Sequence, residues 1–103
     1  VKLSHLLALV KAYGLFLFLV CEDEDSIREF VVINLVRSGY EVVDVNCGED
    51  ALKAYDEKDG GFDVALLDIM MPGIDGMQVC KKIREKSNIE VQYCFIYSIQ
   101  MIH

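Results

Sequence analysis

Residues 62–76 read FDVALLDIMMPGIDG, an apolar run that ends in an acid and passes into a loop. An apolar run this short is typical of a strand that is covered on both faces, as in a parallel sheet. Pro72, Gly73 and Gly76 predict the loop, and Asp68 stands where the strand meets it. The stretch therefore predicts a buried strand that brings one carboxylate to the end of a sheet.

The same pattern occurs earlier in the chain. Residues 15–20 are apolar at every position, and the acidic run Glu22 to Asp25 follows after Cys21. Two more strands are predicted at 42–45 and 89–97, the latter from its β-branched and aromatic residues. Helices are predicted after Ser26, over about 49–58 and over about 76–86. This alternation predicts an α/β fold with a doubly wound parallel sheet.

The helix after the first strand has several sequence signals. Ser26 or Asp25 is predicted to cap it, with Glu29 completing a capping box, and Gly39 stands just past its end. Its expected buried face consists of Ile27, Phe30, Val31, Asn34 and Leu35. In the second helix, Ala51, Leu52 and Tyr55 are expected to point inward.

Length and composition favour one globular domain. The chain has 103 residues, of which 53% are hydrophobic and 26% charged. Its net charge of −7 argues against a general nucleic-acid binder, because such binding depends on phosphate neutralisation by Lys and Arg. An acidic chain of this kind suits a divalent cation or a basic partner surface.

The N-terminal residues differ from the rest. Residues 1–14 are expected to form an extension in which Leu3, Leu6, Leu7 and Val10 share one face of a short helix. A membrane span over 3–20 is disfavoured by the central Lys11, and a signal peptide lacks small residues before Cys21; export is the minor alternative. The four cysteines show no metal or redox spacing, which favours reduced cysteines in a cytoplasmic protein; a disulfide pair is the alternative. No contact with a membrane is expected.

Three acids are expected to converge. Ligand sites in doubly wound sheets form at the carboxyl ends of the strands, where Glu22, Asp23 and Asp68 are predicted to lie. Carboxylates brought together repel one another, which raises their pKa values or recruits a cation, and oxygen ligands with open water positions suit Mg²⁺. The alternative is that these are ordinary surface acids.

These residues resemble a known family. LVCEDE at 19–24 and LLDIMMPGIDG at 66–76, with its D-x-x-M-P-x-x-D-G pattern, resemble the receiver domain of two-component response regulators, and SGYEVVDVNCGEDALKAY at 38–55 adds to the likeness. The resemblance runs from about residue 15 to residue 98, so residues 15–103 are taken as the receiver domain.

The resemblance implies a flavodoxin-like strand order and a signalling module, not a substrate-turning enzyme. Asp68 would accept a phosphoryl group from a sensor histidine kinase. Mg²⁺ would be held by Glu22, Asp23, Asp68 and the backbone carbonyl of Met70. Ser98, at the end of the fourth strand, would follow the phosphoryl group. For the side chains of Met70, Met71 and Met77, core or loop packing is the expected role.

The chain also departs from the family, which continues with a fourth helix, a fifth strand ending in a Lys, and a fifth helix. This sequence ends at His103 without that Lys, so an incomplete receiver fold is expected. The alternative function is a truncated or degenerate receiver that acts only by protein contacts or has no function. An aspartate-nucleophile phosphatase is disfavoured, because Met70 stands where such enzymes need a second acid.

The uncharged stretch 91–99 is expected to form an exposed edge that favours a homodimer or larger assembly.

Overall fold

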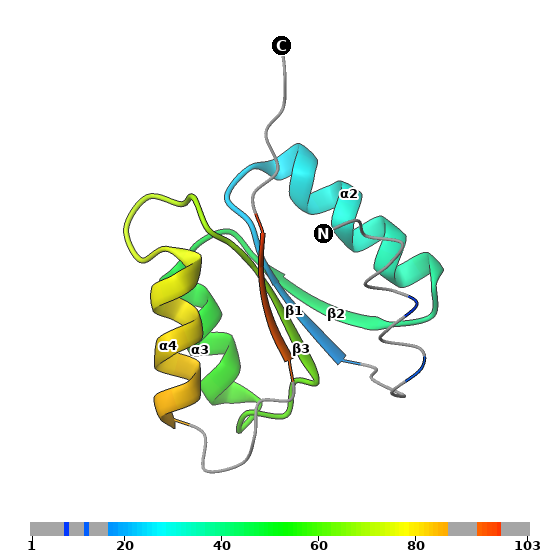
Figure 1. The fold of residues 1–103 in the computed structure, drawn as a ribbon. Coiled ribbons are helices and arrows are strands. Elements are labelled where there is room, and N and C mark those ends of the chain that lie inside the picture. Colours follow the sequence, from blue (N-terminus) through cyan, green and yellow to red (C-terminus); the bar gives the residue numbers. More distant parts are fainter. Residues whose placement is uncertain (1–7, 9–11, 13–16, 87–92, 98–103) are drawn as a thin grey trace.

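Four parallel strands form an open sheet with helices on both faces in the computed structural model (Figure 1). The structure describes residues 8, 12 and 17–86, together with the backbone of residues 93–97. The strands are β1 (Leu17–Cys21), β2 (Glu41–Val45), β3 (Val64–Asp68) and β4 (Tyr93–Tyr97). Their order is β2-β1-β3-β4, which confirms the predicted doubly wound sheet with flavodoxin-like order.

Three helices connect these strands. They are α2 (Asp25–Arg37), α3 (Gly48–Glu57) and α4 (Gly76–Lys86). In Figure 1, α2 lies on one face of the sheet, and α3 and α4 lie side by side on the other. In this part of the chain, no helix is long and apolar enough to cross a membrane. Ala8 and Ala12 are helical and exposed, but the rest of the predicted N-terminal helix lies outside the described residues.

Both faces of β1 are buried, which explains why its sequence is apolar at every position. Phe18 and Val20 pack under α2, whereas Leu19 and Cys21 belong to the core under α3 and α4. Successive side chains of a strand point to opposite faces, so a strand covered on both sides cannot alternate with polar residues. β3 has the same character, since all five of its residues are buried.

The end of α2 follows the prediction. Gly39 has a φ of 91°, and its N–H donates to the carbonyl oxygen of Val36 at 3.0 Å. The N–H of Tyr40 donates to the carbonyl oxygen of Leu35 at 3.1 Å. These two bonds form the Schellman motif, in which glycine takes the left-handed position without strain.

Two expectations for α2 were wrong. Its N-cap is Glu24, which makes no side-chain capping bond, so neither Ser26 nor Asp25 caps the helix and no capping box forms with Glu29. Ile27, Val31 and Leu35 are buried as expected and Asn34 is half-buried, but the Phe30 side chain is 58% exposed. Because the buried residues recur at every fourth position, the buried stripe of α2 is narrow and leaves Phe30 outside it. In α3, Ala51 and Tyr55 are buried and Leu52 is half-buried, as expected.

Candidate functional site

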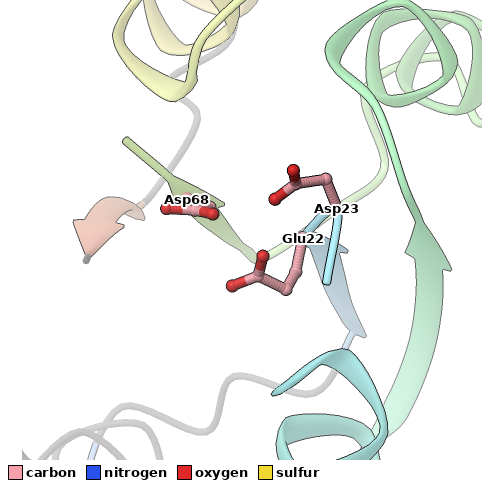
Figure 2. A group of neighbouring side chains, drawn as sticks. All are labelled: Glu22, Asp23 and Asp68. Carbon is pink, nitrogen blue, oxygen red and sulfur yellow. The ribbon is translucent and has the colours of Figure 1, made fainter. Parts of the chain in front are cut away.

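The carboxylates of Glu22, Asp23 and Asp68 converge at the carboxyl ends of β1 and β3. One possible ligand oxygen from each residue lies within 4.8 Å of the other two. Figure 2 shows the Glu22 and Asp23 side chains extending toward the side on which Asp68 lies. The register explains this convergence: Cys21 pairs with Leu67, so the next residue of each strand, Glu22 and Asp68, reaches the same level. The three predicted acids are thus brought together as expected.

The position of this cluster follows from the strand order. After β1 the chain crosses to β2 on one side, and β3 then lies on the other side of β1. The helices that follow β1 and β3 lie on opposite faces of the sheet, which makes the region between the two strand ends a topological switch point. The cluster lies at this switch point.

Glu22 is the most deeply buried of the three, with only 1% of its surface exposed. One of its carboxylate oxygens accepts a hydrogen bond from the N–H of Glu24 at 3.1 Å, and its own N–H donates to the carbonyl oxygen of Val45 at 3.1 Å. The pKa of Glu22 is raised to about 8, and burial is the largest cause; the bond from the N–H of Glu24 opposes the shift, while the neighbouring Asp68 adds to it. Loss of hydration is therefore a larger cause of the raised pKa than the charge repulsion expected from the sequence.

Asp68 is 7% exposed and is oriented by the loop that follows it. The N–H of Met70 donates to its Oδ1 at 3.0 Å. Asp23, in contrast, is exposed, so the cluster is open to solvent on that side. A carboxylate held in this way can act as a nucleophile toward a group that approaches from solvent.

The loop after Asp68 is closed by a capping box that sequence reasoning missed. The N–H of Gln78 donates to Asp75 Oδ1 at 2.9 Å, and the N–H of Asp75 donates to Gln78 Oε1 at 3.0 Å. The signal was present, since an acid is followed three residues later by Gln at the start of a helix. This reciprocal pair begins α4 and fixes the far end of the loop.

Gly76 lets α4 approach the backbone of Asp68 closely. A Cβ atom at this position would overlap the carbonyl oxygen of Asp68 and lie 2.8 Å from its carbonyl carbon. The loop can therefore turn back against the end of β3 only with glycine at position 76.

The methionines divide between core and surface. Met71 is buried, and Cys21 Sγ lies 3.5 Å from its Sδ beneath the cluster. Core or loop packing was the expected role for the three methionine side chains; Met71 packs in the core, whereas Met70 and Met77 are exposed. Burial also raises the pKa of Cys21 to about 12, so this thiol is not a nucleophile at neutral pH.

Two predicted site positions are not settled by this geometry. Ser98 lies outside the described residues. Met70 is placed beside Asp68 by the hydrogen bond of its N–H, whereas a ligand role for its carbonyl oxygen stays a prediction. The described cysteines Cys21, Cys47 and Cys80 are free.

Comparison with known families and proteins gives a consistent result. The response regulator receiver domain family matches residues 18–99. The alkaline phosphatase synthesis transcriptional regulatory protein PhoP of Bacillus subtilis is 46% identical over 69 residues, which are 66% of this chain and 28% of that protein. The sensory transduction protein RegX3 of Mycobacterium tuberculosis is 38% identical over 73 residues, which are 71% of this chain and 31% of that protein. The chain thus spans less than a third of the length of these relatives.

Solved structures show the same fold. The chemotaxis protein CheY4 of Vibrio cholerae superposes with a TM-score of 0.72 at 29% identity, over 80% of this chain and 67% of that one. TrrA of Thermotoga maritima, solved in complex with Mg²⁺-BeF, gives a TM-score of 0.66 at 38% identity, over 79% and 65%. A chain in the complex of histidine kinase ThkA with TrrA gives 0.65 at 30% identity, over 81% and 86%.

Proposed function

This chain belongs to the response regulator receiver domain family, and on that premise we propose that Asp68 accepts a phosphoryl group from a sensor histidine kinase. The observation that carries the proposal is the convergence of Glu22, Asp23 and Asp68 at the switch point of the sheet. The fold and the family support a signalling module of two-component systems that is not a classical enzyme.

The donor set of the cluster fits Mg²⁺. All three side chains offer carboxylate oxygens, and the exposed side at Asp23 leaves room for water ligands, which Mg²⁺ usually keeps. We propose that Glu22, Asp23 and Asp68 hold the ion, with the carbonyl oxygen of Met70 as a further ligand. When bound, Mg²⁺ supplies positive charge next to the phosphoryl oxygens. The solved structure of the relative TrrA with Mg²⁺-BeF supports this assignment.

The chemistry proposed for the chain itself is nucleophilic. A carboxylate oxygen of Asp68 attacks phosphorus and forms a P–O bond, while the P–N bond to the donor histidine breaks and the imidazole leaves with the electron pair. The bond from the Met70 N–H to Oδ1 orients the Asp68 carboxylate for this attack. Ser98 is proposed to follow the phosphoryl group, by resemblance to the family. The complex of ThkA with the relative TrrA supports a histidine kinase as the partner.

Labelling with small phosphoryl donors tests the proposal. Incubation with Mg²⁺ and either acetyl phosphate or phosphoramidate, whose P–N bond resembles that of phosphohistidine, should place one acid-stable, base-labile phosphate on the peptide that contains Asp68. Mass spectrometry should show that Asp68→Asn abolishes the label and that Asp56→Asn keeps it, because Asp56 pairs with Lys86 on the surface.

Two other results of the labelling experiment would contradict the proposal. Label on Ser98 or on a histidine would contradict the assignment of Asp68. Mg²⁺ binding without any label would favour the alternative of a degenerate receiver that acts only by protein contacts.

A further inference from the structure

The side chain of Arg28 joins three elements at the base of the acidic cluster. Its Nη1 donates to the carbonyl oxygen of Glu22 at 2.9 Å, and its Nη2 donates to Asp25 Oδ1 at 2.6 Å. Its Nε lies 3.3 Å from Asp44 Oδ2 on β2. The three nitrogens of one planar group thus reach the end of β1, the first turn of α2 and the neighbouring strand. The Arg28 side chain is only 17% exposed, so it is held in this place.

The contact with Glu22 bears on the geometry of the cluster. The carbonyl group that Arg28 binds belongs to the peptide between Glu22 and Asp23, and its orientation determines the direction in which the Asp23 side chain leaves the backbone. Asp23 is exposed, so packing does little to place its carboxylate, and the backbone of the turn contributes to its placement. The N–H of Glu22 donates to the carbonyl oxygen of Val45, and the carbonyl oxygen of Glu22 accepts a hydrogen bond from Arg28. Both backbone polar groups of Glu22 are thus held.

We propose that Arg28 is a positioning residue for the cation site, which it serves by fixing the Glu22–Asp23 peptide so that the Asp23 carboxylate faces Asp68. This inference rests on the proposed function, in which these acids hold Mg²⁺. A Lys cannot replace the guanidinium, because an ammonium group is a point charge without the planar fork that serves three acceptors at once.

The loss of the Arg28 charge and the loss of its positioning role change the affinity for Mg²⁺ in opposite directions. The direction of the change in an Arg28 variant therefore tests the inference. Removal of a positive charge beside three carboxylates makes the site more negative, and simple electrostatics then expects tighter binding of Mg²⁺. Loss of the fixed peptide instead weakens binding, by about tenfold if Arg28 resembles other residues that orient metal ligands.

Calorimetric titration of the full chain with MgCl₂ decides between these effects. We expect Arg28→Met to bind Mg²⁺ about tenfold more weakly than the wild type and Arg28→Lys to bind it several-fold more weakly. The control Arg37→Met removes the same charge from the exposed last turn of the same helix and should change the affinity less than twofold. Because Arg28→Lys keeps both the charge and the long stem, it remains informative if Arg28→Met does not fold.

A melting curve of each variant in EDTA measures its stability apart from the cation. A folded Arg28→Lys protein with wild-type affinity overturns the role of Arg28 and leaves the proposed function intact, as does tighter binding by Arg28→Met. If the wild type itself binds no Mg²⁺, the proposed cation site fails, and the role of Arg28 fails with it.

Discussion

Glu22 links the cation site to proton binding. Its buried carboxyl group has a pKa near 8, so at pH 6 to 7 the protein without a cation holds a proton there. A cation must displace that proton, because the ligand is the carboxylate. We therefore predict that Mg²⁺ affinity rises between pH 6 and pH 8 by up to about tenfold per pH unit, which calorimetry in matched buffers can measure. Glu22→Gln should bind more weakly and with a flatter pH dependence, and equal wild-type affinity at pH 6 and pH 8 would refute the link.

The same pKa affects stability in the absence of a cation. The folded protein keeps the proton of Glu22 until about pH 8, whereas the unfolded chain releases it near the ordinary value of 4.5. Because the folded state binds more protons in this interval, the contribution of Glu22 to stability is full below pH 4.5 and is lost as the pH rises toward 8. Occupation of the site by Mg²⁺ should reverse this loss, since a ligand that binds only the folded state stabilises it.

Sequence reasoning found the three acids because a simple rule places them. Glu22, Asp23 and Asp68 each stand at the end of an apolar strand, and parallel strands end at the same edge. Arg28 follows no such rule. Its contact with Asp44 depends on the register of β2 against β1, in which Val20 pairs with Asp44, and a sequence does not state that register.

At the scale of elements, the close approach of α4 to the end of β3 depends on Gly76. We predict that Gly76→Ala lowers the free energy of unfolding by about 1–3 kcal/mol, because its Cβ meets backbone that must move. It should also weaken Mg²⁺ binding, since the backbone that moves carries Asp68. Chemical denaturation and calorimetry measure the two effects.

Gly39→Ala is the matched control for that variant. Position 39 has a positive φ but open space around its Cα, so the substitution strains the backbone without a clash. It should lower stability while leaving Mg²⁺ affinity unchanged. If Gly76→Ala also leaves the affinity unchanged, the approach of α4 does not position Asp68.

The helix α2 shows where periodicity fails as a guide. The apolar residues of its sequence, DSIREFVVINLVR, are not confined to one face of the helix. Several faces are therefore almost equally apolar, and the sequence does not show which one is buried. Phe30 was assigned to the buried face, whereas Phe30, Ile33 and Val36 are exposed. The bounds of α3 and α4 are close to those predicted, because Gly60 and Gly61 follow α3 and Gly76 stands at the start of α4.

At the scale of the whole molecule, β4 is an edge of the sheet. In the described part of the chain it pairs only with β3, and its sequence, YCFIY, carries no charge. Exposed edges of this composition favour pairing between chains. We therefore predict a dimer or larger assembly in sedimentation experiments at micromolar concentration, and less of it for Ile96→Lys. A stable monomer in which residues 93–97 are protected from hydrogen exchange would show that the edge is covered within one chain.

The pairing of β1 with β3 also sets an order of events in time. The acids at 22 and 23 meet the acid at 68 only when β3 docks beside β1, and the chain between these strands contains β2 and two helices. Such long-range pairing is slow to form, because the entropy of closing the loop must be overcome first. A cation then has no complete site to bind until folding is nearly finished. We expect Mg²⁺ to leave the refolding rate nearly unchanged and to slow unfolding, which stopped-flow denaturant jumps with and without MgCl₂ can resolve.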